Sequence, residues 1–231
     1  MAYTQIDKIY KNKDIAFKLN TLLPKNLSIL SKKYHFKLIH ISTDQLFDGK
    51  KKTYYENCSP TPINLYAKQK AQAENYIKKN SSNYLILRTN FFGMSTSKNK
   101  SFDIIYDSLS KNKQLLFYSD IYFNPIYVGD LVLIIYKLIK INAKGTFNIS
   151  SDKKISKFDF AKMICDLFQF PHSNIISLEY KNDKIFKEKR PKNMFISNKK
   201  MKSKLSMKNI SVLIGLKKIK KIIERQDKFV T

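Results

Sequence analysis

Tyr66 and Lys70 are the two residues whose types and spacing most clearly suggest chemistry. They stand four positions apart, so on a helix they share one face. A phenol normally ionises at pH ~10, and a neighbouring ammonium favours the phenolate. The pair therefore predicts a tyrosine that acts as an acid or a base nearer neutrality, with its pKa lowered by the lysine.

Hydroxyl and carboxyl groups at the end of an apolar run complete this pattern. Residues 36–41 are predicted to form a buried strand, and Ser42, Thr43 and Asp44 follow it directly. A carbonyl reductase needs a hydroxyl to orient the carbonyl oxygen and an acid to protonate it. A strand-end hydroxyl beside a Tyr–Lys helix could supply both groups.

The elements that must position these residues alternate along the chain. Helices are predicted over residues 13–34 (with a break at Pro24), 65–79, 102–111, 128–141, 157–168 and 211–225, and strands over 36–41, 84–89, 114–118 and 146–149. Strands that alternate with helices of about 10–15 residues predict an α/β fold with a parallel sheet. Ser156 is expected to cap its helix. Val132, Ile135 and Leu138 are expected to share one side of their helix, and the side chains of Phe158, Ala161, Ile164 and Cys165 are expected to face inward.

Residues 42–49 (STDQLFDG) and 64–70 (NLYAKQK) resemble the extended short-chain dehydrogenase/reductase superfamily, and within it the dTDP-4-dehydrorhamnose reductase family. Further segments resemble that family in the same order: AYT at 2–4, LRTNF at 87–91, NPIYVGDL at 124–131, GTFNIS at 145–150 and RPKN at 190–193. The resemblance runs from residue 2 to about residue 216, nearly the whole chain.

This resemblance implies the NADPH- or NADH-dependent reduction of the 4-keto group of a nucleotide-linked deoxysugar, on the route to dTDP-L-rhamnose. The implied catalytic residues are Thr43, Tyr66 and Lys70, with Tyr66 as the proton donor. The implied cofactor contacts are Ala2, Tyr3, Tyr66 and Lys70. The implied substrate contacts are Ser42, Thr43, Asp44, Phe91 and Arg190. Plain structural roles remain open for several of them, such as core packing for Phe91 and a salt bridge for Arg190.

The Gly-rich turn that normally cradles a dinucleotide is not visible in this sequence. The first of the five glycines is Gly49, whereas such a turn opens the first βα unit of the fold. We therefore expect an α/β fold with a partial Rossmann-like, doubly wound parallel sheet and a small C-terminal substrate lobe. Residues 1–150 would form the C-terminal part of the dinucleotide-binding domain, and residues 151–231 the substrate lobe with a basic C-terminal helix, the two lobes being interleaved.

The missing turn leaves two further interpretations open. The chain could be a non-catalytic subunit like the regulatory subunit of methionine adenosyltransferase, which shares the RPKN element. It could also be one piece of a split enzyme whose N-terminal half is separately encoded. A sheet without its first strands exposes a parallel edge, so we expect an isolated chain to be marginally stable, homo-oligomeric or prone to aggregate.

Composition limits the other classes. The net charge is +26, but arginine supplies only Arg88, Arg190 and Arg225 of the 44 basic residues. Base readout favours arginine, so we expect a nucleotide-sugar substrate and no specific nucleic-acid partner. No apolar run reaches the ~18–20 residues of a membrane span, and no signal peptide is visible. The two cysteines fit a reducing cytoplasm, and the three histidines show no metal-ligand spacing.

Overall fold

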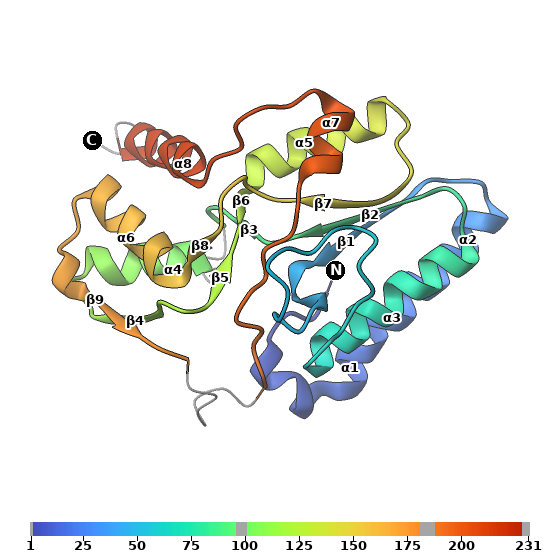
Figure 1. Cartoon of the computed structure of the whole chain (residues 1–231), viewed down its shortest axis with the longest axis horizontal. Helices are drawn as coiled ribbons and strands as arrows, with labels where there is room; N and C mark the ends of the chain where they lie inside the picture. Colours follow the sequence, from blue (N-terminus) through green and yellow to red (C-terminus); the bar gives the residue numbers. More distant parts are fainter. Residues whose placement is uncertain (1, 96–100, 181–187, 228–231) are drawn as a thin grey trace.

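A computed structural model describes residues 2–95, 101–180 and 188–227. Its centre is a parallel sheet of β1 (Leu38–Thr43), β2 (Tyr84–Thr89) and β7 (Gly145–Ile149), in the order β1–β2–β7 (Figure 1). Thr43 lies opposite Thr89, and Thr89 opposite Ile149, so the three carboxyl ends meet at one edge of the sheet. In open α/β sheets this is the edge where ligands bind.

The predicted α/β class with a parallel sheet is confirmed. The observed bounds of β2 are those predicted, whereas β1 begins two residues later and ends two residues later than predicted. Ser42 and Thr43 therefore belong to the strand and do not follow it. Their backbones continue the pairing with Arg88 and Thr89, and this pairing is not visible in the hydrophobic pattern.

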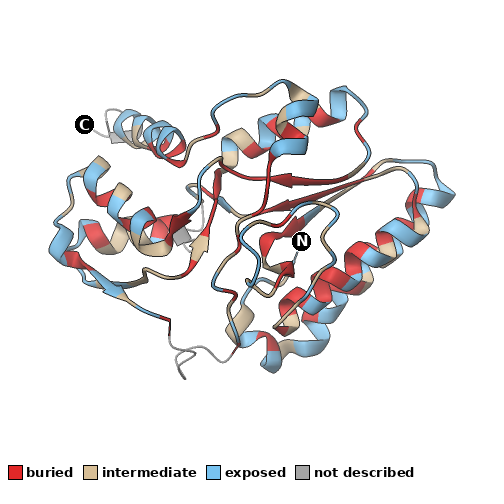
Figure 2. Cartoon of the chain, in the orientation of Figure 1, coloured by how far each residue is buried: buried red, intermediate tan, exposed pale blue. Residues whose placement is uncertain are grey.

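Helices cover both faces of the sheet (Figure 1). α2 (Leu23–Lys33) and α3 (Leu65–Asn80) lie on one face, and α5 (Val128–Lys140) and α7 (Lys199–Leu205) lie on the other. Figure 2 shows that the strands are buried and that the helices expose their outer sides. The start of α3 is fixed by Asn64, whose side chain accepts a hydrogen bond from the backbone of Ala67 at 2.8 Å.

The N-terminal helical region is less regular than predicted. A 3-10 helix, η1 (Ile6–Asn12), leads into α1 (Lys13–Phe17), then a π-helical segment, η2 (Lys18–Leu22), and then α2. Pro24 is the second residue of α2, and it does not interrupt the helix, because Leu22 and Leu23 on its N-terminal side keep right-handed helical backbone angles. The irregularity falls in η2 instead, just ahead of the predicted break.

A second lobe packs beside the sheet, at the left of Figure 1. It contains α4 (Ser101–Ser110), α6 (Lys157–Phe168), α8 (Val212–Asp227), and β4 (Leu115–Tyr118) paired in parallel with β9 (Ile175–Leu178). The buried aromatic residues of its core come from both sides of residue 150 and include Phe92, Phe102, Phe123 and Phe160. The chain therefore contributes to this core before and after it completes the sheet.

Short strands that were not predicted connect the two regions. β3 (Phe91–Phe92) pairs in parallel with β6 (Ile126–Tyr127), and β5 (Tyr122–Phe123) pairs antiparallel with β8 (Ile155–Ser156). Each contains two residues, too few for a periodic pattern. Two short 3-10 turns, η3 (Asp44–Leu46) and η4 (His172–Asn174), and helix α7 were also not predicted.

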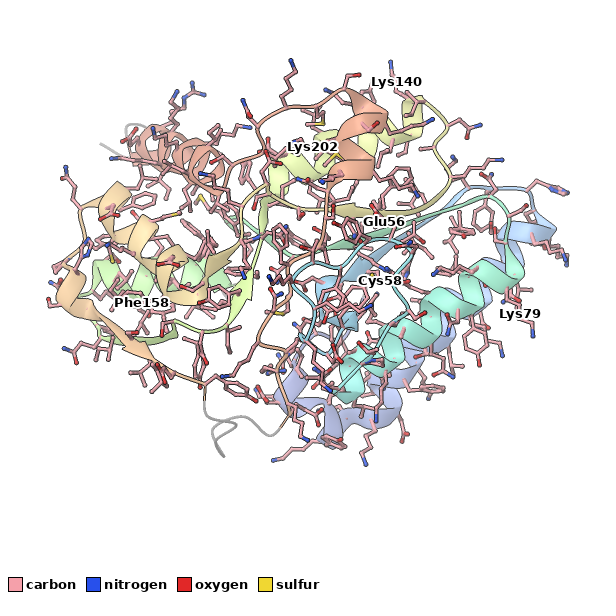
Figure 3. All side chains as sticks on the ribbon, viewed as in Figure 1. Glu56, Cys58, Lys79, Lys140, Phe158 and Lys202 are labelled. Atoms are coloured by element: carbon pink, nitrogen blue, oxygen red, sulfur yellow. The ribbon has the colours of Figure 1, made fainter. Side chains whose placement is uncertain are left out.

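The predicted inward face of α6 is confirmed, and the predicted shared side of α5 is correct only in part. Ser156 caps α6 in a capping box with Asp159, as expected. Ala161, Ile164 and Cys165 are buried, and Phe158 is partly buried against the aromatic core (Figure 3). On α5 the expectation that Val132 and Leu138 share one side is wrong, because Val132 is 60% exposed and Leu138 is buried. The buried residues there are Leu131, Ile134 and Leu138.

β1 has a free outer edge within the part of the chain that is described. Leu38 donates its N–H to Asn83 on the β2 side, so the alternation of a strand turns the peptide groups of Ile39 and Ile41 to the outer side. Ile41 is 39% exposed, and Leu23 of α2 lines the same groove. An exposed parallel edge was expected, and it is flanked by apolar side chains.

No helix in residues 2–95, 101–180 and 188–227 is long and apolar enough to cross a bilayer.

Candidate active site

A groove of about 570 Å³ lies at the carboxyl end of β1. The structure brings together the three predicted catalytic residues in its wall: Thr43 at the end of the strand, and Tyr66 and Lys70 on the first turns of α3. Both α3 residues are buried, so their polar ends meet the groove rather than bulk water. The predicted shared helix face is therefore real, and it faces the end of the strand.

Tyr66 is an acid that stays protonated at neutral pH. Burial raises the pKa of its phenol to about 12, a hydrogen bond with Thr43 opposes the shift, and the negative charge of Asp44 adds to it. The expectation that Lys70 lowers the pKa of Tyr66 was wrong for this structure. The Lys70 ammonium is held elsewhere, and burial dominates.

Lys70 is bound to the edge of β1. Its Nζ donates to the carbonyl oxygen of Ile41 at 2.8 Å and lies 3.0 Å from Nε2 of His40. Burial lowers the pKa of Lys70 to about 8, and Glu74 opposes the shift. Burial and the Lys70 charge lower the pKa of His40 to about 3, so the imidazole is neutral near pH 7. His40 was missed as a site residue, although its place two residues before Ser42 could have indicated it.

Asp44 connects the strand end to the opposite wall. Its carboxylate accepts from the Thr43 hydroxyl at 3.3 Å and from the Asn90 amide at 3.0 Å, and only 1% of the residue is exposed. Burial raises the pKa of Asp44 to about 6, while Asn90 and Lys157 oppose the shift. Asn90 belongs to the LRTNF segment but was not singled out, because its contact depends on the tertiary structure.

Ser42 contributes to the frame of the groove. Its hydroxyl donates to Glu74 at 2.7 Å, and Glu74 also accepts from Arg88 at 2.7 to 3.2 Å. The side chains of Glu74 and Arg88 are fully buried. Burial alone would raise the pKa of Glu74, but the Arg88 pair and the Ser42 hydroxyl lower it overall. The hydroxyl of Ser42 thus joins β1 to α3, and its contact with substrate stays a prediction.

Of the first residues of the chain, some line the groove and one does not. Ala2 lines the groove together with Thr4. Tyr3 does not, because its backbone is held by Asn20 through two hydrogen bonds and its ring packs with Tyr66 in a small apolar cluster. The contact of Tyr3 with a cofactor stays a prediction, and in this structure its ring packs against Tyr66.

A second cavity, of about 420 Å³, adjoins the groove. The two share Gln45, Asn90 and Phe91 in their walls, and Phe91 is 51% exposed at the boundary. The aromatic residues of its wall are Phe91, Phe92, Phe117, Tyr118, Phe123 and Phe160. We call this space the aromatic cavity. Phe91 lies at its mouth and is not a core residue.

Two cations line the aromatic cavity. Arg190 forms an ion pair with Asp7 at 2.6 Å, so the salt bridge left open as its structural role exists. Its side chain also lines the cavity, and its contact with substrate stays a prediction. Lys157 is the first residue of α6, and its Nζ lies 3.3 Å from the centroid of the Phe123 ring. Lys157 was missed because a lysine at a helix start normally points to solvent.

The FDG turn and the RPKN element form one unit. Gly49 has φ +82°, and an added Cβ would lie 2.9 Å from the backbone nitrogen of Lys192. The Asn193 amide donates to the carbonyl oxygens of Lys51 and Lys52. Glycine is required here both by the conformation and by this close approach. Two predicted motifs far apart in sequence therefore lie against each other.

No group of three or more His, Cys, Asp or Glu side chains that could hold a metal ion occurs among the described residues.

Comparisons with known proteins agree with this geometry. The model of the family described as "RmlD substrate binding domain" matches residues 1–223. The chain is 28% identical over 171 residues to the probable low-salt glycan biosynthesis reductase Agl14 of Haloferax volcanii, covering 72% of this chain and 57% of that protein. It is 25% identical over 207 residues to methionine adenosyltransferase 2 subunit beta of Rattus norvegicus, covering 85% and 61%. The chain thus spans about three fifths of the length of these curated relatives.

Solved structures give a closer match in length. The dTDP-4-dehydrorhamnose reductase of Bacillus anthracis in complex with NADP superposes with a TM-score of 0.88 at 28% identity, covering 96% of this chain and 78% of that one. The corresponding reductase of Clostridium acetobutylicum gives a TM-score of 0.88 at 26% identity, covering 96% and 79%. With the family model matching nearly every residue, the chain belongs to the RmlD substrate-binding-domain family of extended short-chain dehydrogenase/reductase proteins.

Proposed function

We propose that this chain carries the catalytic and substrate-binding part of an NADPH- or NADH-dependent reductase. Its reaction would reduce the 4-keto group of a nucleotide-linked deoxysugar, as in the formation of dTDP-L-rhamnose. The observation that carries the proposal is the convergence of Thr43, Tyr66 and Lys70 in one groove at the carboxyl ends of the sheet. The similarity to solved dTDP-4-dehydrorhamnose reductases supports this choice of substrate.

The side chains of the groove suit the protonation of a carbonyl oxygen. The phenol of Tyr66 carries a proton at neutral pH, and Thr43 lies beside it with its hydroxyl oriented by Asp44 and Gln45. A bound carbonyl oxygen would accept hydrogen bonds from both hydroxyls, and Tyr66 would transfer its proton as negative charge develops on that oxygen. A reduced nicotinamide, when bound, supplies the hydride.

The groove fits only one end of a dinucleotide. Tyr66, Lys70 and Ala2 line it and would hold the nicotinamide and its ribose. None of the described residues in its wall is a glycine, so the wall has no turn at which backbone N–H groups could closely approach a diphosphate. A different polypeptide segment must supply that cradle for the proposed reaction to proceed.

The free edge of β1 is the surface that such a segment would occupy. Ile39 and Ile41 turn their peptide groups to this edge, where the Ile41 carbonyl oxygen already accepts from Lys70, and Leu23 and Leu27 form an apolar wall beside them. We propose that a separately encoded N-terminal half adds a parallel strand at this edge, with a homo-oligomer as the alternative. Free thiols at Cys58 and Cys165 support a cytoplasmic location.

Cofactor binding and turnover test the proposal. We expect the chain, alone or with the product of an upstream reading frame, to bind NADPH or NADH and to oxidise it with dTDP-4-dehydro-6-deoxyhexose. Tyr66→Phe should lower the turnover rate by about 10²–10⁴-fold while cofactor binding persists. Tyr76→Phe, on the same helix but outside the groove, is the matched control. An absence of turnover in both preparations would contradict the proposal.

The partner is tested separately. Ile41→Lys places a charge at the β1 edge and should abolish association with a strand-donating partner. Ile222→Lys is the matched control, because Ile222 has the same exposure of 39% but lies on α8. Light scattering of the purified chain and its mixtures reports the outcome. Equal association of both variants would mean that the partner binds elsewhere.

A second candidate function is a non-catalytic subunit. The similarity to methionine adenosyltransferase 2 subunit beta favours it, as does the absence of a glycine from the described groove wall. It predicts a stable stoichiometric partner and no reductase turnover with any supplied N-terminal half. Capture of such a partner, followed by a turnover assay of the purified complex, decides between the two functions.

A further inference from the structure

Lys157 occupies an unusual place for a lysine. The capping box of Ser156 and Asp159 fixes the start of α6, and the Lys157 N–H donates to the Ile121 carbonyl at 3.0 Å. Its side chain enters the aromatic cavity and sets the ammonium against the face of Phe123. A lysine at this position would keep more hydration if it extended to solvent, so its inward orientation carries a desolvation penalty.

Among the described residues, Arg190 forms a salt bridge at the aromatic cavity and Lys157 does not. Burial lowers the pKa of Lys157 to about 8, Asp44 raises it, and Arg190 lowers it. Two cations therefore line one cavity. Arg190 is paired with Asp7, whereas the Asp44 carboxylate accepts from Thr43 and Asn90 and the Lys157 ammonium packs on the Phe123 ring. A ligand with more than one negative charge would be attracted by both cations.

We propose that Lys157 binds the diphosphate of the nucleotide-linked substrate and makes the aromatic cavity selective for a diphosphate over an uncharged nucleoside. This rests on the proposed function in one respect, that the ligand is a nucleotide-linked sugar. Arg190 lies in the same wall and would share the charge. Lys157 would thus be a specificity-determining residue, separate from the proton-donating groups of the groove.

The shape and lining of the cavity support this ligand class. The cavity of about 420 Å³ shares Asn90 and Phe91 with the groove, so one extended ligand could reach from the groove into it. Such a ligand carries its sugar, diphosphate and base in that order. Aromatic side chains such as Phe117 and Tyr118 offer faces on which a base can stack.

Calorimetric titration with dTDP and with thymidine tests the assignment without cofactor or turnover. Lys157→Met should weaken dTDP binding by about 10- to 100-fold, the loss expected for one charged hydrogen bond, and should change thymidine binding little. Lys157→Arg should keep dTDP affinity within a few-fold of the wild type. Lys162→Met is the matched control, because Lys162 is exposed on the same helix and lies outside the cavity wall.

Salt dependence gives a second readout that simple loss of packing would not change. Wild-type affinity for dTDP should fall more steeply with ionic strength than that of Lys157→Met, because one charge contact is missing in the variant. Thermal unfolding of each variant shows whether it is folded at the titration temperature. If Lys157→Met is not folded at that temperature, dTDP binding is measured with Lys157→Gln instead, and the salt dependence of binding is measured with Lys157→Arg.

Three results would overturn the assignment: no binding of dTDP by the wild type, unchanged dTDP affinity in Lys157→Met, or an equal loss of thymidine and dTDP. The proposed reaction fails in a different way. If the wild type binds dTDP with the expected dependence on Lys157 but never oxidises NADPH, the assignment of Lys157 stands and the proposed reductase function is wrong. If the protein turns over but Lys157→Met binds dTDP as tightly as the wild type, the reductase function stands and the assignment of Lys157 is wrong.

Discussion

The groove and the aromatic cavity adjoin each other, but different interactions form their walls. In the groove, polar side chains bind one another in fixed pairs, such as Ser42 with Glu74 and Asp44 with Asn90. In the aromatic cavity, rings form the wall, and the cations Lys157 and Arg190 are the charged groups that line it. A fixed network suits the orientation of a reacting carbonyl, whereas an apolar wall with two cations suits recognition of a large anion. The difference suggests that chemistry and recognition are divided between the two spaces.

The largest effect should come from the frame of the groove. Glu74→Leu leaves Arg88 buried without its carboxylate, which should lower the free energy of unfolding by about 3–5 kcal/mol. Urea denaturation measures this. Glu224→Gln is the control, because its pair with Lys220 is largely exposed and should contribute at most about 1 kcal/mol. Similar small effects of both would remove the contrast between a fixed groove and an ordinary surface.

Asp44 should make the stability of the groove depend on pH. Its pKa is raised to about 6 in the folded protein from 3.8, so the folded state binds the proton more tightly than the unfolded state. Stability should therefore fall as the pH rises from about 4 to about 6, by about 3 kcal/mol in total. Asp44→Asn should remove that fall in urea titrations across this range.

His40 should change the stability in the opposite direction as the pH rises in the same experiment. Its pKa is lowered to about 3 from 6.5, so the unfolded state binds its proton more tightly and stability should rise between those pH values. His40→Gln should remove the rise and leave the fall due to Asp44. If both substitutions change the profile in the same direction, the charges in the groove are not arranged as described.

The aromatic cavity should respond to packing rather than to pH. Phe160 contacts the rings of Phe92 and Phe123 at centroid distances of 5.3 and 5.7 Å. Phe160→Leu should lower the free energy of unfolding by about 1–3 kcal/mol, equally at pH 5 and pH 7. A strong pH dependence of this loss would mean that the cavity and the Asp44 network are one unit.

The smallest effect is expected at the start of α6. Ser156→Ala removes one half of the capping box and should lower the free energy of unfolding by about 1 kcal/mol. Because Lys157 follows this cap, dTDP affinity should fall slightly in the same variant. Ser110→Ala, near the end of α4, is a control that should leave both unchanged.

Long periodic segments were predictable from the sequence, and contacts between segments were not. The bounds of β2 and α6, and the shared helix face of Tyr66 and Lys70, follow from local patterns. The π-helical segment, the two-residue strands and the exposure of Val132 depend on tertiary packing. The pKa of Tyr66 was predicted in the wrong direction because the sequence shows that a lysine lies nearby, but not that its ammonium binds Ile41 and His40. Lys157 was missed because a sequence does not show which way a lysine points.

The carbonyl oxygen of Ile41 has one further consequence. It lies on the outer edge of β1, where a partner strand would pair, and it already holds the Lys70 ammonium. Strand addition and the position of this lysine are therefore thermodynamically linked through a single atom. If the addition of a partner strand changes the free energy with which a ligand binds Lys70, then that ligand changes the free energy of strand addition by the same amount. The affinity of the β1 edge for a partner strand can therefore depend on whether the neighbouring binding site is occupied.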